Sequence, residues 1–268
     1  MQRFTTSDGL RIAYAIDDHT DPWTAPPTLI LLHSAMSSMR RLYAMVPHFT
    51  RRFRVVRMDL RGHGESDVPG ADQPLTLARL TRDVLELLDH LGVEQAHFLG
   101  VSGGGYLAQQ LAIHHPARVS SLLLFASRPG FKDSKGAHWI PEMERVGLRA
   151  FIAQTLDERL PCERLSPAQI DWFLDEIARN DESFVKRFIQ YMTTQYWMDD
   201  LARIRCPTLL VAPAGDAIGN AAAYTEMQRL IAGSELVVYD AANHNICDYL
   251  PDRCAQDAAG FLHRHVSS

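Results

Sequence analysis

Short apolar runs alternate along this chain with helical patterns, and this alternation restricts the fold more than any other feature of the sequence. The segment PTLILLHS is almost continuously apolar, which is typical of a strand buried on both faces. Strands are predicted at 11–17, 27–34, 53–60, 96–102, 119–127, 207–215 and 234–242. Such an alternation of strands and helices predicts an α/β protein with a mostly parallel central sheet and helices on both faces.

The clearest helical pattern covers residues 76–91. Its leucines and Val84 recur at spacings that place one apolar stripe on one face of a helix, and Gly92 follows as a natural end. Further helices are expected near 40–50, 104–115, 220–231 and 248–265.

Residues 130–200 interrupt the alternation, because they contain helical patterns and no strand pattern. One pattern covers 140–156, and another begins at Ser166 and Pro167, with Gln169 placed to complete a capping box. We therefore expect a helical cap, residues 129–200, inserted into a core formed by residues 1–128 and 201–268. The cap is expected to lie over the carboxyl edge of the sheet.

Charge and composition exclude several classes of function. The formal net charge of −5 gives no reason to expect nucleic acid or an anionic membrane as a partner. No apolar stretch approaches the roughly 18 residues of a membrane span, and the first residues lack the pattern of a secretory leader, so a cytoplasmic location is expected. The four cysteines form no metal-binding spacing, and free thiols and no metal site are expected. The sequence carries no signal for an oligomeric state.

The most specific motif is Gly100-Val101-Ser102-Gly103-Gly104, which fits the pattern G-x-S-x-G between a strand and a helix. A turn of this kind lifts the serine hydroxyl above the sheet edge, and small neighbours are needed because the backbone packs closely there. It also places the N–H of Gly103 at the start of a helix, where partial positive charge favours an oxyanion. We expect Gly105, beyond the motif, to let the helix approach the sheet.

A serine hydroxyl needs a base, and the base needs an acid that orients it. Among the twelve histidines, His244 lies on a loop that follows a predicted strand, at the sheet edge where ligands collect. Asp216 lies on the loop after the preceding strand. The order Ser102, Asp216, His244 is the order of the α/β-hydrolase arrangement. Asp248 is the rival acid, and we expect it instead to cap the last helix.

Three further segments carry a resemblance to a known family. LLHSAMSS (31–38) resembles the oxyanion segment of α/β-hydrolases, DLRGHGES (59–66) resembles their D-x-R-G-x-G-x-S signature, and Asn243-His244 resembles their histidine loop. The chain departs from the family at Ser34, where glycine is usual. Within the family it is most similar to 3-oxoadipate enol-lactonases and related small-capped esterases and lactonases.

The resemblance implies an α/β-hydrolase fold and a serine hydrolase that acts on a small ester or lactone. Ser102 would attack the carbonyl carbon, His244 would move the proton, and Asp216 would hold the imidazole. The N–H groups of Gly103 and, by resemblance, Ala35 would bind the oxyanion. No metal and no organic cofactor is implied.

Four residues are candidates for contact with the substrate. Ser34 adjoins the oxyanion segment, and Trp139 and Trp197 lie in the expected cap, where aromatic residues either line a pocket or pack the cap on the core. Arg128 follows a strand and would meet a substrate carboxylate or form a salt bridge at the hinge of the cap.

Three alternatives remain at this point. The same three catalytic side chains serve carbon–carbon bond hydrolases of ring-cleavage diketones. A cofactor-independent dioxygenase would use the histidine and the acid without needing Ser102. A hydrolase-like ligand receptor would keep all three side chains but turn over slowly.

Overall fold

The structure, a computed structural model, describes residues 1–132, 134–219 and 221–265, and these form one eight-stranded sheet in the order β1-β2-β4-β3-β5-β6-β7-β8. The pairs β1–β2 and β2–β4 are antiparallel, and all other pairs are parallel. The strands are β1 Gln2–Thr5, β2 Arg11–Asp17, β3 Thr28–Leu32, β4 Arg54–Met58, β5 Ala96–Val101, β6 Val119–Phe125, β7 Thr208–Pro213 and β8 Glu235–Tyr239. The predicted mostly parallel α/β sheet is confirmed.

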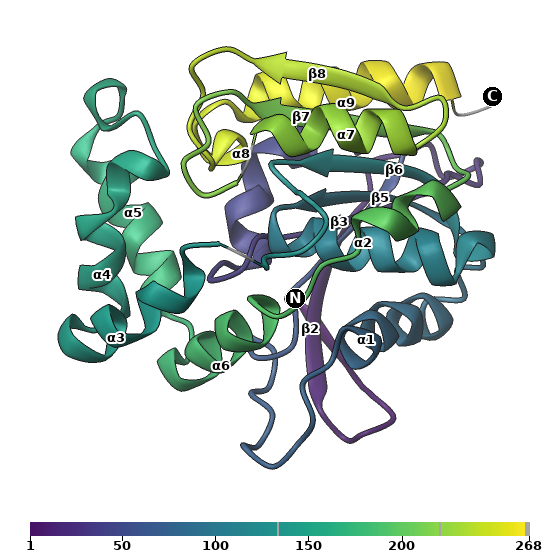
Figure 1. Ribbon diagram of the computed structural model, residues 1–268. Coiled ribbons are helices and arrows are strands. Elements are labelled where there is room, and N and C mark those ends of the chain that lie inside the picture. Colours follow the sequence, from purple (N-terminus) through teal and green to yellow (C-terminus); the bar gives the residue numbers. More distant parts are fainter. Residues whose placement is uncertain (133, 220, 266–268) are drawn as a thin grey trace.

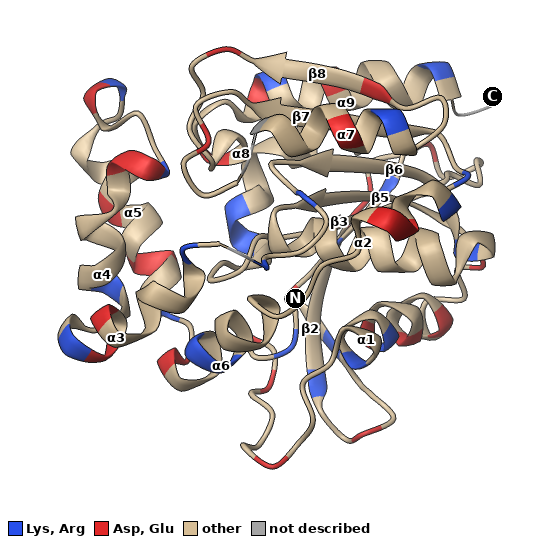
Figure 2. Ribbon diagram, viewed as in Figure 1, with Lys and Arg blue, Asp and Glu red and all other residues tan. Residues whose placement is uncertain are grey.

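Both faces of the sheet are buried, and this explains the continuous apolar runs. In β3, Ile30 and Leu32 belong to one apolar cluster, whereas Leu29 and Leu31 belong to a second cluster on the opposite face. Figure 2 shows β5, β6 and β7 free of charged residues, whereas β2 and β8, nearer the edges of the sheet, carry some. The first cluster includes side chains of α1 Leu77–His90, α2 Gly103–His114 and α7 Ala221–Leu230, and the second those of the 3-10 helix η1 Met39–His48 and of α9 Pro251–His265.

Between β6 and β7 the described residues form helices and no strand of the sheet. These helices are α3 Gly136–Val146, α4 Leu148–Gln154, α5 Pro167–Ala178 and α6 Glu182–Met192, with short 3-10 turns η3 Leu156–Glu158, η4 Cys162–Arg164 and η5 Met198–Arg203. In Figure 1, α3, α4 and α5 lie off the side of the sheet toward which the arrowheads of β6 and β8 point. An isolated bridge pairs Gly130 with Tyr196, so the two ends of the inserted helices meet. The division of the chain into a core and a cap stays a prediction.

Two of the predicted signals for the start or end of a helix are confirmed. Ser166 and Gln169 form the expected capping box at the start of α5, and Gly92 has a φ of 65° just beyond α1. Prolines account for two differences from the expected helices. Pro47 lies inside η1, where it removes a donor, and the chain is 3-10 helical there rather than α-helical. The expected helix 248–265 is divided at Leu250, because Pro251 disfavours an α conformation for the residue before it.

Two other elements of the structure differ from those predicted: one was too short to predict, and one begins at a different residue. Strand β1 was not predicted, because its four residues are too few to show a period. Residue 220, the first of the expected helix 220–231, lies outside the described residues, and α7 begins at the next position.

The described part of the chain contains no helix that is both long and apolar enough to cross a bilayer. Within the same residues, no three His, Cys, Asp or Glu side chains come together as a group that could hold a metal ion. None of the four cysteines, all of which lie in the described residues, forms a disulfide. Cys247 and Cys254 are buried, and Cys162 and Cys206 are half-buried.

Candidate active site

Ser102 lies on a strained turn between β5 and α2. Its backbone has φ 47° and ψ −113°, a combination that residues with a side chain rarely adopt. Close packing around the turn explains the neighbouring glycines. A Cβ at Gly104 would overlap the backbone carbonyls of Leu32 and His33, and a Cβ at Gly105 would overlap the side chain of Ser127. Glycine is therefore required for α2 to approach β3 and β6, as expected for Gly105.

The structure brings Ser102, His244 and Asp216 together. His244 Nε2 lies 3.0 Å from Ser102 Oγ, and His244 Nδ1 lies 2.9 Å from Asp216 Oδ2. Asp216 follows β7 and His244 follows β8, so parallel strands deliver both side chains to the same edge as the Ser102 turn. His244 is 7% exposed and Asp216 is 9% exposed, so the chain of hydrogen bonds is shielded from water.

Asp216 is held as a carboxylate. Burial alone would raise its pKa, but His244 and the backbone N–H groups of Gly219 and Ile218 outweigh burial and lower the pKa below its usual value. Those two N–H groups donate to Asp216 Oδ1 at 2.7 and 2.9 Å, which leaves Oδ2 directed at the imidazole. The carboxylate therefore fixes Nδ1 of His244 as the protonated nitrogen and leaves Nε2 free to accept the Ser102 proton.

The loop after β3 presents backbone amides beside this turn. His33 is fully buried, and its Nε2 accepts a hydrogen bond from the N–H of Leu60 at 3.0 Å, so its Nδ1 donates to the carbonyl of Ser34 at 2.7 Å. Burial lowers the pKa of His33 to about 4, which keeps the ring neutral. The ring thereby holds Ser34 in place, and Met36 takes a φ of 56°.

These contacts set the direction of the Ala35 amide. A Cβ built on Gly103 would lie 2.8 Å from the Ala35 nitrogen, so the two backbones are adjacent. The N–H of Gly103 is the first of α2 and has no partner within the helix. The backbone of Ala35 therefore lies beside the start of α2, and Ala35, Gly103 and Ser102 line the same pocket.

A small pocket of about 50 Å³ lies over Ser102 and His244. Its walls are mainly apolar and come largely from the segment between β6 and β7, including Phe131, Trp139, Phe173, Ile177, Phe188 and Met192. Ser34, Ala35 and Gly103 line its floor, and Arg41, Arg159 and Asn245 are polar residues in its lining. Apolar walls with a few polar groups are typical of a site for a small organic molecule.

The four candidate substrate residues divide into two pairs. Ser34 and Trp139 line the pocket, whereas Arg128 and Trp197 do not. Arg128 donates from Nη2 to the carbonyl of Lys132 at 3.3 Å, and its guanidinium lies 5.4 Å from the centre of the Phe131 ring. Trp197 packs edge-on against Tyr106.

The ring N–H of Trp197 begins a buried chain of hydrogen bonds that the sequence did not indicate. It donates to Gln109 Oε1 at 2.9 Å, and Gln109 Nε2 donates to Ser127 Oγ at 3.2 Å. Ser127 Oγ in turn donates to the backbone carbonyl of Ser102 at 2.8 Å. The inserted helices are thereby tied to the strained turn. Gln109 lies within a regular helix and carried no local signal.

The expectation that Asp248 caps the last helix is wrong. Asp248 lies inside the short helix α8 Ile246–Tyr249 and pairs with Arg41, whose Nη2 lies 2.6 Å from its Oδ2. The N–H of Asp248 bonds to the carbonyl of Asn245, so its position is set by α8 rather than by a helix start.

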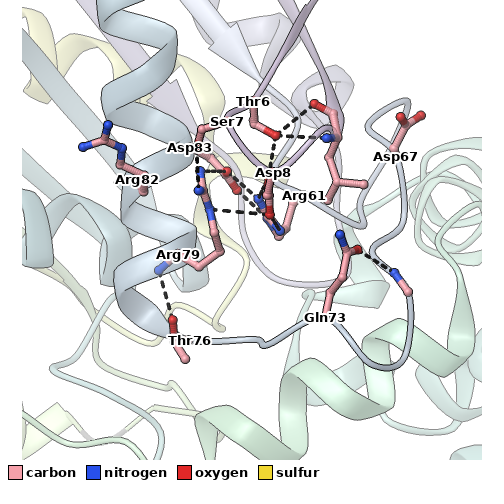
Figure 3. Close-up of polar contacts among 12 residues, drawn as sticks. Thr6, Ser7, Asp8, Arg61, Asp67, Gln73, Thr76, Arg79, Arg82 and Asp83 are labelled. Atoms are coloured by element: carbon pink, nitrogen blue, oxygen red, sulfur yellow. Dashed lines mark hydrogen bonds and ion pairs between the residues drawn. The ribbon is translucent and has the colours of Figure 1, made fainter.

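The DLRGHGES segment carries a buried ion cluster rather than a pocket residue. Arg61 is 1% exposed, and its Nε and Nη2 donate to Asp83 at 2.6 and 2.7 Å. Its Nη1 and Nη2 also donate to Asp8 at 2.8 and 3.1 Å, and Arg79 joins the cluster through Asp83 (Figure 3). Arg61 therefore fastens the turn after β4 to α1 and to the β1–β2 turn. In the same segment, buried Asp59 accepts hydrogen bonds from the N–H groups of Met39 and Glu65.

Comparisons with known proteins show the family to which this fold belongs. Residues 27–166, about half of the chain, match the model of the alpha/beta hydrolase fold family. The 3-oxoadipate enol-lactonase 1 of Acinetobacter baylyi is 28% identical over 254 residues, which cover 88% of each chain. A crystal structure of a hydrolase from Pseudomonas aeruginosa PA01 is 33% identical and superposes with a TM-score of 0.86 over 97% of both chains.

A second similar structure, the enol-lactonase from Burkholderia xenovorans LB400, is 23% identical and has a TM-score of 0.89, with 98% of this chain and 100% of that chain covered. At that identity the likeness concerns the fold alone. On the family match, the eight-stranded sheet and these relatives, the chain belongs to the alpha/beta hydrolase fold family.

Proposed function

We propose that this protein is a serine hydrolase that cleaves a carboxylic ester or a lactone of a small organic molecule. The observation that carries the proposal is the line of side chains from Asp216 through His244 to Ser102 at the floor of an apolar pocket. The enol-lactonase of Acinetobacter baylyi supports the class of substrate, because it is similar along nearly the whole chain.

The reaction follows from the positions of these atoms. His244 Nε2 takes the proton of Ser102 Oγ as the oxygen attacks the carbonyl carbon, and the N–H groups of Ala35 and Gly103 stabilise the oxyanion. The C–O bond to the leaving group then breaks, and His244 gives its proton to the departing oxygen. Water loses a proton to His244 and attacks the acyl carbon. The bond from that carbon to Ser102 Oγ then breaks, His244 returns the proton to Ser102 Oγ, and the acid is released. These steps need no metal or organic cofactor.

We also propose that residues 129–200 serve as a cap on a core of residues 1–128 and 201–268. The apolar side chains that close the pocket over Ser102 come from α3, α5 and α6 of this segment. A cap of this kind would exclude water from the acyl-enzyme and select the shape of the acyl group.

Labelling with a fluorophosphonate probe tests the proposal. The wild-type protein should be labelled, Ser102→Ala should not, and Ser34→Ala should keep the label, because the Ser34 hydroxyl has no hydrogen bond to His244. Hydrolysis of p-nitrophenyl acetate and butyrate should fall by at least about 10³-fold in Ser102→Ala. Wild-type turnover in that variant would remove the proposed nucleophile.

The same measurements separate the alternatives. A slow receptor would release about one equivalent of p-nitrophenolate per chain and then stop, whereas a hydrolase continues. A carbon–carbon bond hydrolase would turn over a vinylogous diketone in preference to lactones and esters. A cofactor-independent dioxygenase would require oxygen and would tolerate the loss of Ser102.

A further inference from the structure

Arg159 is a buried guanidinium whose two terminal nitrogens have no partner among the described residues. The residue is 2% exposed, and neither Nη1 nor Nη2 forms a hydrogen bond. None of the ion pairs in the described part of the chain includes it, and the carboxylate of the adjacent Glu158 lies 3.3 Å from Lys135 instead. Leaving a cation unpaired in the interior is unfavourable, so the position calls for a partner that the described residues do not supply.

The side chain lies in the wall of the pocket over Ser102. Arg159 and Ser102 both line this pocket, and no Asp or Glu among the described residues does. The other arginine of the lining, Arg41, is already held by both oxygens of Asp248. Among the described residues that line the pocket, Arg159 is therefore the arginine without a carboxylate partner.

The backbone of Arg159 is fixed to the loop that carries His244. The N–H of Asn245 donates to the carbonyl of Arg159 at 3.0 Å, and Asn243 Nδ2 donates to the carbonyl of Asp157 at 2.6 Å. Both neighbours of His244 therefore hold the same short segment. The guanidinium also lies 5.2 Å from the centre of the Trp139 ring, which limits where it can swing. A group bound by Arg159 would consequently have a defined position relative to the reacting atoms.

Burial lowers the pKa of Arg159 to about 10, so the side chain remains a cation at neutral pH. The two free nitrogens of one guanidinium are spaced for the two oxygens of a carboxylate. Apolar walls surround this single charge, and the cavity is small. That combination fits a short apolar chain or ring that ends in one carboxylate better than it fits a phosphate dianion, which would leave a negative charge without a partner.

The geometry points to a substrate that carries a free carboxylate in addition to its ester or lactone bond, with Arg159 as the residue that binds it. This inference rests on the proposed function for the identity of the bond that is cleaved. The assignment differs from the expectation for Arg128, which lies outside the pocket lining.

Matched pairs of p-nitrophenyl esters test the inference. One member of each pair is the half-ester of succinate, glutarate or adipate, and the other is the straight-chain ester of equal carbon number without the second carboxylate. In the wild-type protein, kcat/KM for the charged ester of one chain length should exceed that of its neutral partner by about 10- to 100-fold. In Arg159→Met and Arg159→Gln this ratio should fall toward one, and Arg159→Lys should recover part of it.

Two further variants test whether the preference for charged esters depends on Arg159 in particular. Arg164→Met removes an exposed arginine of the same segment, whose side chain is 78% exposed, and should keep the wild-type ratio. Arg128→Met should keep it as well. Equal use of charged and neutral esters by the wild-type protein at every chain length, or loss of the preference in Arg128→Met alone, would overturn the assignment.

Failure of the proposed function gives a different result from failure of this inference. If the wild-type protein hydrolyses none of the esters, the proposed function fails. Binding of an anion at Arg159 is then tested by measuring the Tm with and without added glutarate or adipate. A rise in Tm for the wild-type protein that is absent in Arg159→Met supports the site even then. No rise in the wild-type protein, or an equal rise in both, contradicts it.

Discussion

Two buried arginines of this protein have opposite surroundings. Arg61, after β4, donates four hydrogen bonds to the carboxylates of Asp83 and Asp8. Arg159, in the wall of the pocket, is as deeply buried, but both of its terminal nitrogens lack a partner in the described residues. The first arginine joins segments that are distant in the sequence, and the second faces a cavity.

The difference separates the framework of the molecule from its binding surface. In the framework, by which we mean the buried contacts that join segments of the fold, buried arginines are paired with carboxylates, as in the Arg61 cluster and the Arg41–Asp248 pair. Such pairs are retained because the loss of one member leaves the other charge buried alone. In the pocket wall a buried charge has no partner among the residues that the structure describes, which is typical of a site whose partner is a ligand.

The largest effect is expected on the rate, from neutralising the carboxylate of Asp216 in the candidate active site. Asp216→Asn should lower kcat by about 10⁴-fold, because the amide no longer holds the required tautomer of His244 or stabilises its charged form. Steady-state hydrolysis of p-nitrophenyl butyrate measures the loss. Asp240→Asn, the same substitution at an exposed position beyond β8, should stay within about twofold of the wild type. A loss below tenfold in Asp216→Asn would mean that another group orients the imidazole.

The next effect concerns stability. Arg61→Met should reduce the free energy of unfolding by about 4 kcal/mol, because Asp83 would keep its burial but lose its main partner. Urea denaturation measures the change. The double variant Arg61→Met with Asp83→Asn should be less destabilised than the sum of the two single variants. If Arg61→Met lowered the free energy of unfolding by less than 1 kcal/mol, the proposed difference between Arg61 and Arg159 would be wrong.

Buried histidines of the framework should make stability depend on pH. Burial lowers the pKa of His33 to about 4, and burial with the nearby His33 ring lowers the pKa of His63 to about 3. Both values lie below the ordinary value of 6.5, so as the pH falls below about 6.5 the unfolded chain binds protons that the folded chain does not. Stability is therefore full above pH 6.5 and is lost as the pH falls toward 4, by about 2 to 3 kcal/mol for each histidine between pH 6.5 and 4.5.

The variant His63→Gln isolates one of these contributions. Its amide can still donate to the carbonyl of Arg61, which the ring contacts through Nδ1 at 3.1 Å, but it does not titrate. Urea denaturation between pH 7.5 and 4.5 should give a shallower loss of stability than in the wild type. The buried carboxylates Asp59 and Asp83 are present in both proteins, so the difference between the two curves reports the histidine. Identical curves would show that this ring is not the source of the dependence.

Local chemistry explains why much of the framework could be predicted from the sequence. Strands buried on both faces produce apolar runs, and the close approach of α2 to β3 demands glycine at position 104. Residues that follow parallel strands must meet at one edge, which is why Asp216 and His244 could be assigned to the same place as Ser102. Each of these conclusions depends on the neighbours of a residue along the chain or on the topology of the sheet.

The pocket wall could not be predicted in the same way. Whether Arg159 is buried, and whether a carboxylate lies near it, depends on packing between segments that are far apart in the sequence. Arg128 and Arg159 have no local pattern that distinguishes them, yet only Arg159 lines the cavity. The direction of the Trp197 ring is likewise set by Gln109, which lies 88 residues away in the chain.

The smallest effect expected is a gain in stability from removing the unpaired charge. Arg159→Met should raise the free energy of unfolding by about 1 kcal/mol, because the buried cation is lost while a flexible apolar chain still packs against Trp139. The contact of the guanidinium with that ring offsets part of the gain, since such contacts contribute about 0.5 to 2 kcal/mol. Arg164→Met, at an exposed position, should change stability by less than about 0.5 kcal/mol. A loss of more than 1 kcal/mol in Arg159→Met would place Arg159 in the framework beside Arg61, and the distinction between the two regions would then fail.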